Sequence, residues 1–297
     1  GITPATCFEK SGKSAFQHEK LPKNPMKSKS NPFLRLPSIL AAAIAFAASA
    51  HAADLTWNAA LPGDWNTSNT NWTGSTWNNG TPDNAIFNNL SGAITLTEAI
   101  TGGSLSFSAA GRESGTHALT LTGSSSLSLA SIGVVGTGLG GNVDNISEAY
   151  NQRLTFENTT ANVSGNAAVG RGMLYLNGAT MNVSGTILSD NAWNIFRADN
   201  STVTATGGID FSSIASAVEL YGGTVTTPFI KVGNATWDGA SGLYLSGVTV
   251  VATQDSTDYI QVYNDGNPNS RAAARIYGGG FFLNSNGHNV TIDTGLW

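Results

Sequence analysis

The stretch LTFENTTANV at Leu154–Val163 returns twenty residues later as LYLNGATMNV at Leu174–Val183. In both, two apolar residues alternate with polar ones, an Asn or Gly follows, and a Thr stands two residues after it. Five copies have their threonines 20, 22, 22 and 25 residues apart, at Thr160, Thr180, Thr202, Thr224 and Thr249. Weaker copies flank them, ending at Ser125 and Gly280. A repeat of this length indicates a protein built from stacked units.

Within this repeat frame, the apolar residues shift by one position at the Asn or Gly. Before that residue the apolar side chains lie at even distances from the Thr, and after it they lie at odd distances. Alternation with period two is typical of a half-buried strand. Because Asn and Gly tolerate left-handed backbone, the change predicts a corner between two strands. Several copies add a third apolar pair, at Ala167/Val169, Ile209/Phe211 and Ile230/Val232.

A unit of strand, corner, strand, loop and strand predicts an all-β fold, a parallel β-helix or β-solenoid. One coil cannot bury its inward face, whereas coils stacked about 4.8 Å apart pair every strand and build a continuous core. The repeated Thr and Asn residues should then form ladders along the stack. Two stretches, Gly133–Asn151 and Gln254–Ser270, are predicted to be inserted loops. A β-sandwich of hairpins is the alternative, although it does not account for a corner recurring five times.

The composition agrees with this fold class and excludes some partners. Gly makes up 35 of 297 residues, and charged residues only 11%. The net charge of −5 hides a division, because seven of the fourteen basic residues precede position 36. The remainder has 7 basic and 17 acidic residues, a net charge of 7 − 17 = −10. An acidic body without a basic stripe argues against nucleic acids and anionic membrane surfaces as partners.

The first 52 residues are predicted to direct export and to lie outside the fold. Residues 1–25 are interpreted as a non-native upstream extension, which contains Cys7, the single cysteine of the chain. Residues 26–52 have a basic start, an apolar run at Leu36–Ala48 and the small-x-small sequence Ala50-His51-Ala52, the pattern of a helical signal peptide. Cleavage there leaves no cysteine and hence no disulfide. An amphipathic N-terminal helix is the alternative.

The segment 53–92 is rich in tryptophan. It contains Gly-Asp-Trp-Asn-Thr at Gly63–Thr67, then Asn-Trp, then Asp-x-Ala-x-Phe at Asp83–Phe87, and Gly-Ser-Leu-Ser-Phe follows at Gly103–Phe107. Over residues 54–130 this order resembles the start of the autotransporter-associated β-strand repeat proteins, large exported proteins of Verrucomicrobia, Planctomycetes and related bacteria.

The resemblance implies a right-handed parallel β-helix passenger at the cell surface or outer membrane, without catalytic residues. It also implies a C-terminal translocator or sorting signal. The sequence ends at Asn289–Trp297 in what reads as another strand. We therefore expect the solenoid, residues 93–297, to be truncated at its C-terminus, and its means of attachment cannot be predicted.

The tryptophans of segment 53–92 have two interpretations. Exposed indole faces would stack on sugar rings and form a carbohydrate-binding module. Buried indoles would instead form an N-terminal cap over the apolar end of the first coil, which solenoids require. The cap is the favoured interpretation. The residues concerned are Trp57, Trp65, Trp72 and Trp77.

Cofactor and metal sites are not indicated. Gly136–Gly141 spells G-x-G-x-x-G, but no helix pattern follows it, as a nucleotide site requires. His117 and His288, the histidines of the mature chain, lie far apart, so zinc is not expected. Oxygen ligands for calcium are only loosely suggested, at Asp255, Asp258 and Asn264–Asn267.

One set of charged residues suggests an enzyme alternative. The spacing of 19, 20 and 21 residues is close to the repeat, so Arg171, Asp190, Asp210 and Lys231 could stack in one column near Trp193. Two carboxylates between two cations would suit a polysaccharide lyase or hydrolase. A solvated ladder of ion pairs is the simpler interpretation.

The sequence therefore predicts an exported structural or adhesive β-solenoid passenger of a bacterial cell surface, or a secreted one. It is not expected to be an enzyme, and no catalytic, cofactor-binding or metal-binding residue is assigned. Its partners are expected to be surface polysaccharides or the surfaces of host or neighbouring cells. A carbohydrate-active β-helix and a carbohydrate-binding module remain the alternatives.

Overall fold

The computed structural model describes residues 52–110, 117–137, 152–213, 215–233, 241–263 and 273–297. All of them belong to one unit, Ser49–Trp297. The predicted upstream extension and signal peptide lie outside the described residues. The described part is built of strands, and it contains no helix that is long and apolar enough to cross a membrane. The all-β prediction is confirmed.

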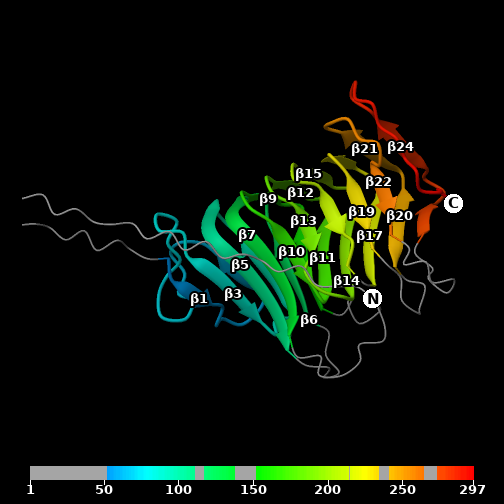
Figure 1. The fold of residues 1–297 in the computed structure, drawn as a ribbon. Coiled ribbons are helices and arrows are strands. Elements are labelled where there is room, and N and C mark those ends of the chain that lie inside the picture. Colours follow the sequence, from blue (N-terminus) through cyan, green and yellow to red (C-terminus); the bar gives the residue numbers. More distant parts are fainter. Residues whose placement is uncertain (1–51, 111–116, 138–151, 214, 234–240, 264–272) are drawn as a thin grey trace, which may run out of the picture. The chain divides into compact units, whose positions relative to one another are not determined.

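The strands form two parallel sheets, which share one direction of stacking (Figure 1). The smaller sheet has nine strands, each paired in parallel with the next in the order given. These strands are β2 (Gly63–Trp65), β4 (Gly92–Leu96), β6 (His117–Thr122), β8 (Gln152–Glu157), β11 (Gly172–Asn177), β14 (Asn194–Asp199), β17 (Ser216–Tyr221), β20 (Gly242–Ser246) and β23 (Ala273–Ile276).

The larger sheet has fifteen strands and divides into two arms at β7. Its first strands are β1 (Asp54–Thr56), β3 (Asn84–Asn88) and the long strands β5 (Ile100–Ala110) and β7 (Ser126–Thr137). The first arm continues with β9 (Thr160–Val163), β12 (Thr180–Val183), β15 (Thr202–Ala205), β18 (Thr224–Thr227), β21 (Val248–Ala252) and β24 (Phe281–Asn284). The second arm continues with β10 (Ala167–Gly170), β13 (Ile187–Ser189), β16 (Ile209–Phe211), β19 (Ile230–Val232) and β22 (Ile260–Val262).

The order of pairing defines a β-solenoid. From β8 onward the chain visits the nine-stranded sheet, the first arm and the second arm in turn, and each strand pairs in parallel with its counterpart one coil later. The third strand of the predicted unit is therefore present, as β10, β16 and β19. Hairpin pairs, which a β-sandwich requires, are absent from the two sheets of the described residues.

The predicted corner is confirmed at the Asn or Gly of every strong copy. The backbone φ angle is positive at each of these positions, in the left-handed region that Gly and Asn enter at least cost. The values are 50° at Asn158, 60° at Gly178, 48° at Asn200, 76° at Gly222 and 66° at Gly247. Each corner carries the chain from the nine-stranded sheet into the first arm.

The threonine ladder is also confirmed, and its ends need correction. Consecutive members face each other across the first arm: Thr160, Thr180, Thr202, Thr224 and Thr249. The residue opposite Thr160 is Ser126 and not Ser125, and the residue opposite Thr249 is Phe282 and not Gly280. The end copies diverge in sequence, so their register could not be read from the frame alone.

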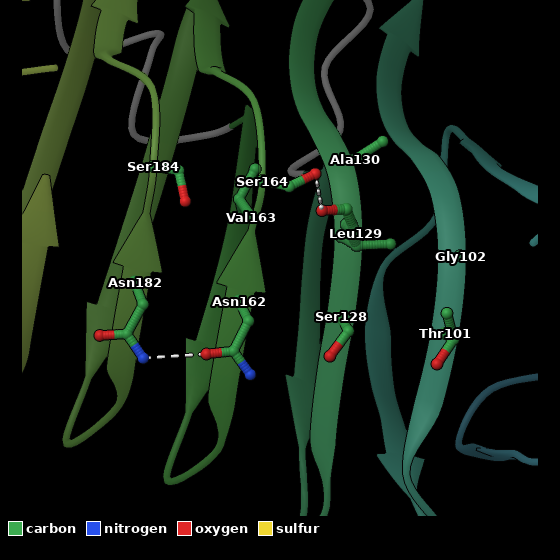
Figure 2. Close-up of a pocket in the computed structure, with 10 residues that line it drawn as sticks. All are labelled: Thr101, Gly102, Ser128, Leu129, Ala130, Asn162, Val163, Ser164, Asn182 and Ser184. Carbon is green, nitrogen blue, oxygen red and sulfur yellow. Dashed lines mark hydrogen bonds between the residues drawn. The ribbon is translucent and has the colours of Figure 1, made fainter. Parts of the chain in front are cut away.

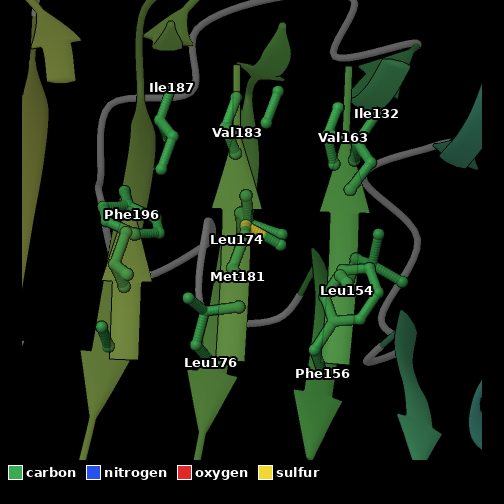
Figure 3. Packing of buried hydrophobic residues seen from close by; sticks show 14 of the residues in the cluster. Ile132, Leu154, Phe156, Val163, Leu174, Leu176, Met181, Val183, Ile187 and Phe196 are labelled. Atoms are coloured by element: carbon green, nitrogen blue, oxygen red, sulfur yellow. The ribbon is translucent and has the colours of Figure 1, made fainter. Parts of the chain in front are cut away.

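The core lies between the two sheets. Leu154, Phe156 and Leu174 from the nine-stranded sheet face Val163 and Met181 from the first arm, as Figure 3 shows. All of these side chains are at most 2% exposed. A fully buried side chain of this size contributes about 1.5–3 kcal/mol through the hydrophobic effect. Stacking therefore supplies the core that one coil lacks.

Both predicted loops contain strand residues, so their boundaries were wrong. Residues 133–137 of the first loop belong to β7, which runs to Thr137, while residues 138–151 lie outside the described part. The second loop contains β22, in which Ile260 is buried opposite Ile230. The polar residues around this short strand hide its pattern. The Trp-rich segment likewise contributes β1, β2 and β3 to the sheets.

Candidate functional site

The four tryptophans of segment 53–92 are buried. Trp57 and Trp72 are 4% exposed, Trp77 is 1% exposed and Trp65 is not exposed. Trp65 is central, because its ring centroid lies 5.0 Å from that of Trp72, 4.8 Å from that of Trp77 and 5.6 Å from that of Phe87. Most of these ring pairs are edge-on, the arrangement that aromatic rings prefer in cores. These indoles therefore offer no face to a sugar ring, and they form part of the apolar core.

The four charged residues of the enzyme hypothesis do not form one column. Asp210 faces Lys231 across β16 and β19, as predicted. On its other side Asp210 faces Leu188 and not Asp190. Arg171 lies between β10 and β11 with a φ of 46°, outside either strand. Asp190 and Arg171 are thus displaced from Asp210 and Lys231. The column on which the lyase hypothesis rested is not formed.

The other weak sequence signals do not converge on a site. Gly136 and Thr137 lie in β7, opposite Ala109 and Ala110, and residues 138–141 of the G-x-G-x-x-G stretch lie outside the described residues, as does Asn264–Asn267. His288 Nδ1 lies 3.3 Å from Asp255 Oδ1 on the surface, while His117 begins β6. Within the described part, no three His, Cys, Asp or Glu side chains gather as metal ligands would.

The sequence analysis missed a row of residues on the outer face of the nine-stranded sheet. Leu174 and Leu176 point into the core, so the residue between them, Tyr175, points outward. On successive coils, the residues paired in line with this outward position form one row: Tyr175, Arg197, Glu219, Tyr244 and Arg275. The first four stand five residues before a repeat threonine, so the repeat frame contained the signal that locates them.

Arg197 is the centre of this row. Its guanidinium carbon lies 5.3 Å from the ring centroid of Tyr175 and 4.9 Å from that of Tyr221, between two coils. Its Nε and Nη2 donate to the two carboxylate oxygens of Asp199 at 2.9 and 2.7 Å, and Nη1 donates to Glu219 at 3.4 Å. The Tyr175 hydroxyl also donates to Asp199, at 2.9 Å. The hydrogen bond to Asp199 raises the Arg197 pKa further above its usual range.

The contacts of Arg197 stabilise the stack. Arg197 is paired with Asp199 and Glu219, and the Glu219 side chain is only 6% exposed. Beside it, Met173, Ile195 and Ala217 form a second apolar cluster, against which Trp193 packs. Cation–π contacts and paired charges of this kind hold neighbouring strands together.

Raising the pH above 10 is expected to destabilise the protein. Burial raises the pKa of the phenols of Tyr175, Tyr221 and Tyr259 above the ordinary value of 10.0. The unfolded chain therefore ionises first, and the free energy of unfolding falls as the pH rises past 10. Urea unfolding at pH 9, 10 and 11 measures this, and Tyr259→Phe should weaken the dependence. An equal free energy of unfolding at the three pH values would contradict it.

The outer face of the first arm has a different character. Thr101, Ser128, Asn162 and Asn182 follow one another in register on β5, β7, β9 and β12 (Figure 2). They border a hollow of about 430 Å³, which we call the polar groove. Its lining residues are Thr101, Gly102, Ser128, Leu129, Ala130, Asn162, Val163, Ser164, Asn182 and Ser184.

The lining of the polar groove is neutral and can form hydrogen bonds. None of its ten lining residues is charged, and none is a His or Cys that could act as a base or a nucleophile of lowered pKa. Hydroxyl and amide groups can donate and accept hydrogen bonds to a ligand. The groove therefore offers neutral hydrogen-bonding groups from adjacent coils.

Parallel coils, a buried aromatic cluster and a neutral polar row on one flank define this chain as a β-solenoid. Over 215 aligned residues the chain is 29% identical to the Adhesin BmaC autotransporter of Brucella suis biovar 1 (strain 1330). The match covers 66% of this chain but only 6% of that protein. No protein-family profile and no solved structure matches the chain. The similarity supports a relationship to autotransporters.

Proposed function

We propose that this chain is part of the passenger of an exported bacterial protein and acts as a structural or adhesive rod at the cell surface. The finer family, the autotransporter-associated β-strand repeat proteins, and its bacterial group are part of the same proposal. They rest on the Trp-rich motif at residues 54–107.

The observation that carries the proposal is the agreement of fold and similarity. The strands stack in parallel over the whole described part, which gives a surface that repeats along one direction. The relative that matches this chain is named an adhesin and an autotransporter. A repeating polar surface suits attachment, because many weak contacts add up when several coils bind together.

The proposal assigns no catalytic activity to the chain. The carboxylates of the enzyme hypothesis, Asp190 and Asp210, are displaced from one another, and those beside Arg197 are paired with it. The partners proposed are surface polysaccharides or the surfaces of host or neighbouring cells. Nucleic acid is not among them, because the sequence after residue 36 is acidic.

Expression of the full chain in a Gram-negative host tests the export part of the proposal. We expect the protein outside the cytoplasm, with Ala53 as its N-terminal residue by mass spectrometry, because the signal peptidase recognises the small residues before it. Replacing Ala50 and Ala52 together by Leu should leave the precursor uncleaved. Processing of that variant at the same site would contradict the prediction.

Attachment of cells to the purified exported protein tests the adhesive part. Cells should adhere to wells coated with it more than to wells coated with an unrelated acidic β-rich protein. The same protein unfolded in urea before coating is the matched control, because it keeps the composition and loses the stacked surface. Equal attachment to all three coatings would refute an adhesive role.

A further inference from the structure

We propose that the polar groove binds an extended, uncharged polysaccharide that lies along the stacking direction. This inference rests on the proposed adhesive function and names its ligand class and its site. The argument depends on three properties of the groove: the spacing of its hydrogen-bonding side chains, the orientation of its amides and its lack of charge.

The spacing suits a polymer of pyranose rings. Thr101 faces Ser128, Ser128 faces Asn162, and Asn162 faces Asn182, so each coil supplies one polar side chain to the row. Successive strands lie about 4.8 Å apart. This distance is close to the length that one pyranose adds to an extended β-linked chain. Each sugar of such a chain would therefore meet one hydrogen-bonding group of the protein.

The two amides of the groove are held in a fixed orientation. Asn182 Nδ2 donates to Asn162 Oδ1 at 2.9 Å. As Figure 2 shows, this bond turns Asn162 Nδ2 toward Ser128 and turns Asn182 Oδ1 away from Asn162. Each amide thus keeps hydrogen-bonding capacity beyond the bond that orients it. A fixed donor and a fixed acceptor on adjacent coils suit the paired hydroxyl groups of sugars, with little loss of side-chain entropy on binding.

The remaining lining residues suit the two faces of a sugar. Leu129 and Val163 form part of the lining and are 4% and 2% exposed, so they offer a small apolar area to ring C–H groups. Ser164 and Ser184 add hydroxyls from the next corner of two adjacent coils. Small residues at Gly102 and Ala130 keep the hollow open. A mainly apolar lining with a few placed, neutral polar groups is typical of sites for uncharged ligands.

The absence of charge in the groove selects against acidic polymers. An anionic sugar would lose hydration and find no cation among the ten lining residues. On the other outer face, Arg197 is already paired with Asp199 and Glu219. Binding in the groove should therefore be insensitive to salt, because no charged pair is screened.

Calorimetry with the full exported chain tests the inference. The probes are three neutral tetrasaccharides, cellotetraose, mannotetraose and chitotetraose, and the anionic tetragalacturonic acid, since four sugars match the four row positions of the groove. At least one neutral probe should bind, with the same Kd in 50 and 500 mM NaCl, and the anionic probe should not. A double substitution, Asn162→Ala with Asn182→Ala, should weaken binding at least tenfold, since two hydrogen bonds are lost. Ala130→Trp, at an exposed rim position, should fill the hollow and abolish binding.

A matched control lies on the next two coils. Thr204 and Thr226 continue the same row but lie outside the groove, so their double replacement by Ala should change Kd less than twofold. Equal weakening by both double variants would overturn the inference, as would binding of none of the neutral probes. Cell attachment without neutral binding leaves the adhesive function standing and refutes the groove. Binding of a neutral probe without cell attachment supports the groove as a binding site and refutes the adhesive function.

Discussion

Replacing Trp65 by Ala is expected to lower the free energy of unfolding by about 3–5 kcal/mol, the usual cost of removing a buried Trp. Trp65 is not exposed, and its ring lies against those of Trp72, Trp77 and Phe87. The smaller side chain leaves a cavity at the centre of the aromatic cluster. Because each coil of a solenoid contacts only its neighbours, the loss should be concentrated at this end of the stack.

Hydrogen exchange and urea unfolding together measure this effect. Peptides that contain β2 to β4 should exchange faster in Trp65→Ala, while peptides that contain β17 and β18 should be unchanged. Trp297 is the matched control, because it is 83% exposed and its replacement by Ala should change the free energy of unfolding by less than about 0.5 kcal/mol. A similar loss in both variants would show that the cluster is not a specific source of stability.

Replacing Gly178 by Val is expected to cost about 2–3 kcal/mol, through backbone strain and a steric clash. The φ angle of 60° at this corner is unfavourable for a β-branched residue. A Cβ atom here would also lie 2.6 Å from Asn158 Oδ1 of the preceding coil, closer than such atoms approach. Thermal unfolding monitored by circular dichroism measures the loss.

The neighbouring coils provide the control for this substitution. The equivalent corners are Asn158 and Asn200, with φ angles of 50° and 48°. Gly178→Asn should therefore cost less than about 1 kcal/mol, because Asn tolerates this conformation and its amide can join a ladder with its neighbours. If Val and Asn were equally destabilising, loss of space and not backbone conformation would be the cause.

The fold could be predicted largely from residues that obey strict local rules. The corner at Gly178 follows from a change of parity, and the ladder at Thr180 and Thr202 follows from the period of two within a strand. The stacked column of Arg171, Asp190, Asp210 and Lys231 was a hypothesis from spacing alone, and only Asp210 and Lys231 are in register. The step between coils grows from 20 residues, Ala167 to Ile187, to 22, Ile187 to Ile209, so equal spacing did not preserve the register.

The candidate sites were harder to predict because they depend on outward positions. The repeat frame was used to locate inward residues, while Tyr175 and Arg197 occupy the polar positions between them. The polar groove depends in addition on Ser128 of β7, whose copy of the repeat was placed one residue away from its true register. A hollow between coils depends on how side chains of several coils pack, and the repeat pattern of one coil does not describe that packing.

The stacking of coils also determines how much longer the molecule becomes when residues are added to the chain. Between Thr180 and Thr224 each coil uses 22 residues, and each adds one strand spacing of about 4.8 Å along the stack. An extended chain gains about 3.3 Å for every residue, so a solenoid gains reach more slowly than a linker by more than an order of magnitude. Duplicating one such coil would hardly move the tip, yet it would add another row of side chains to every flank. Growth of this molecule therefore adds mainly side surface and contributes little to the distance that it spans.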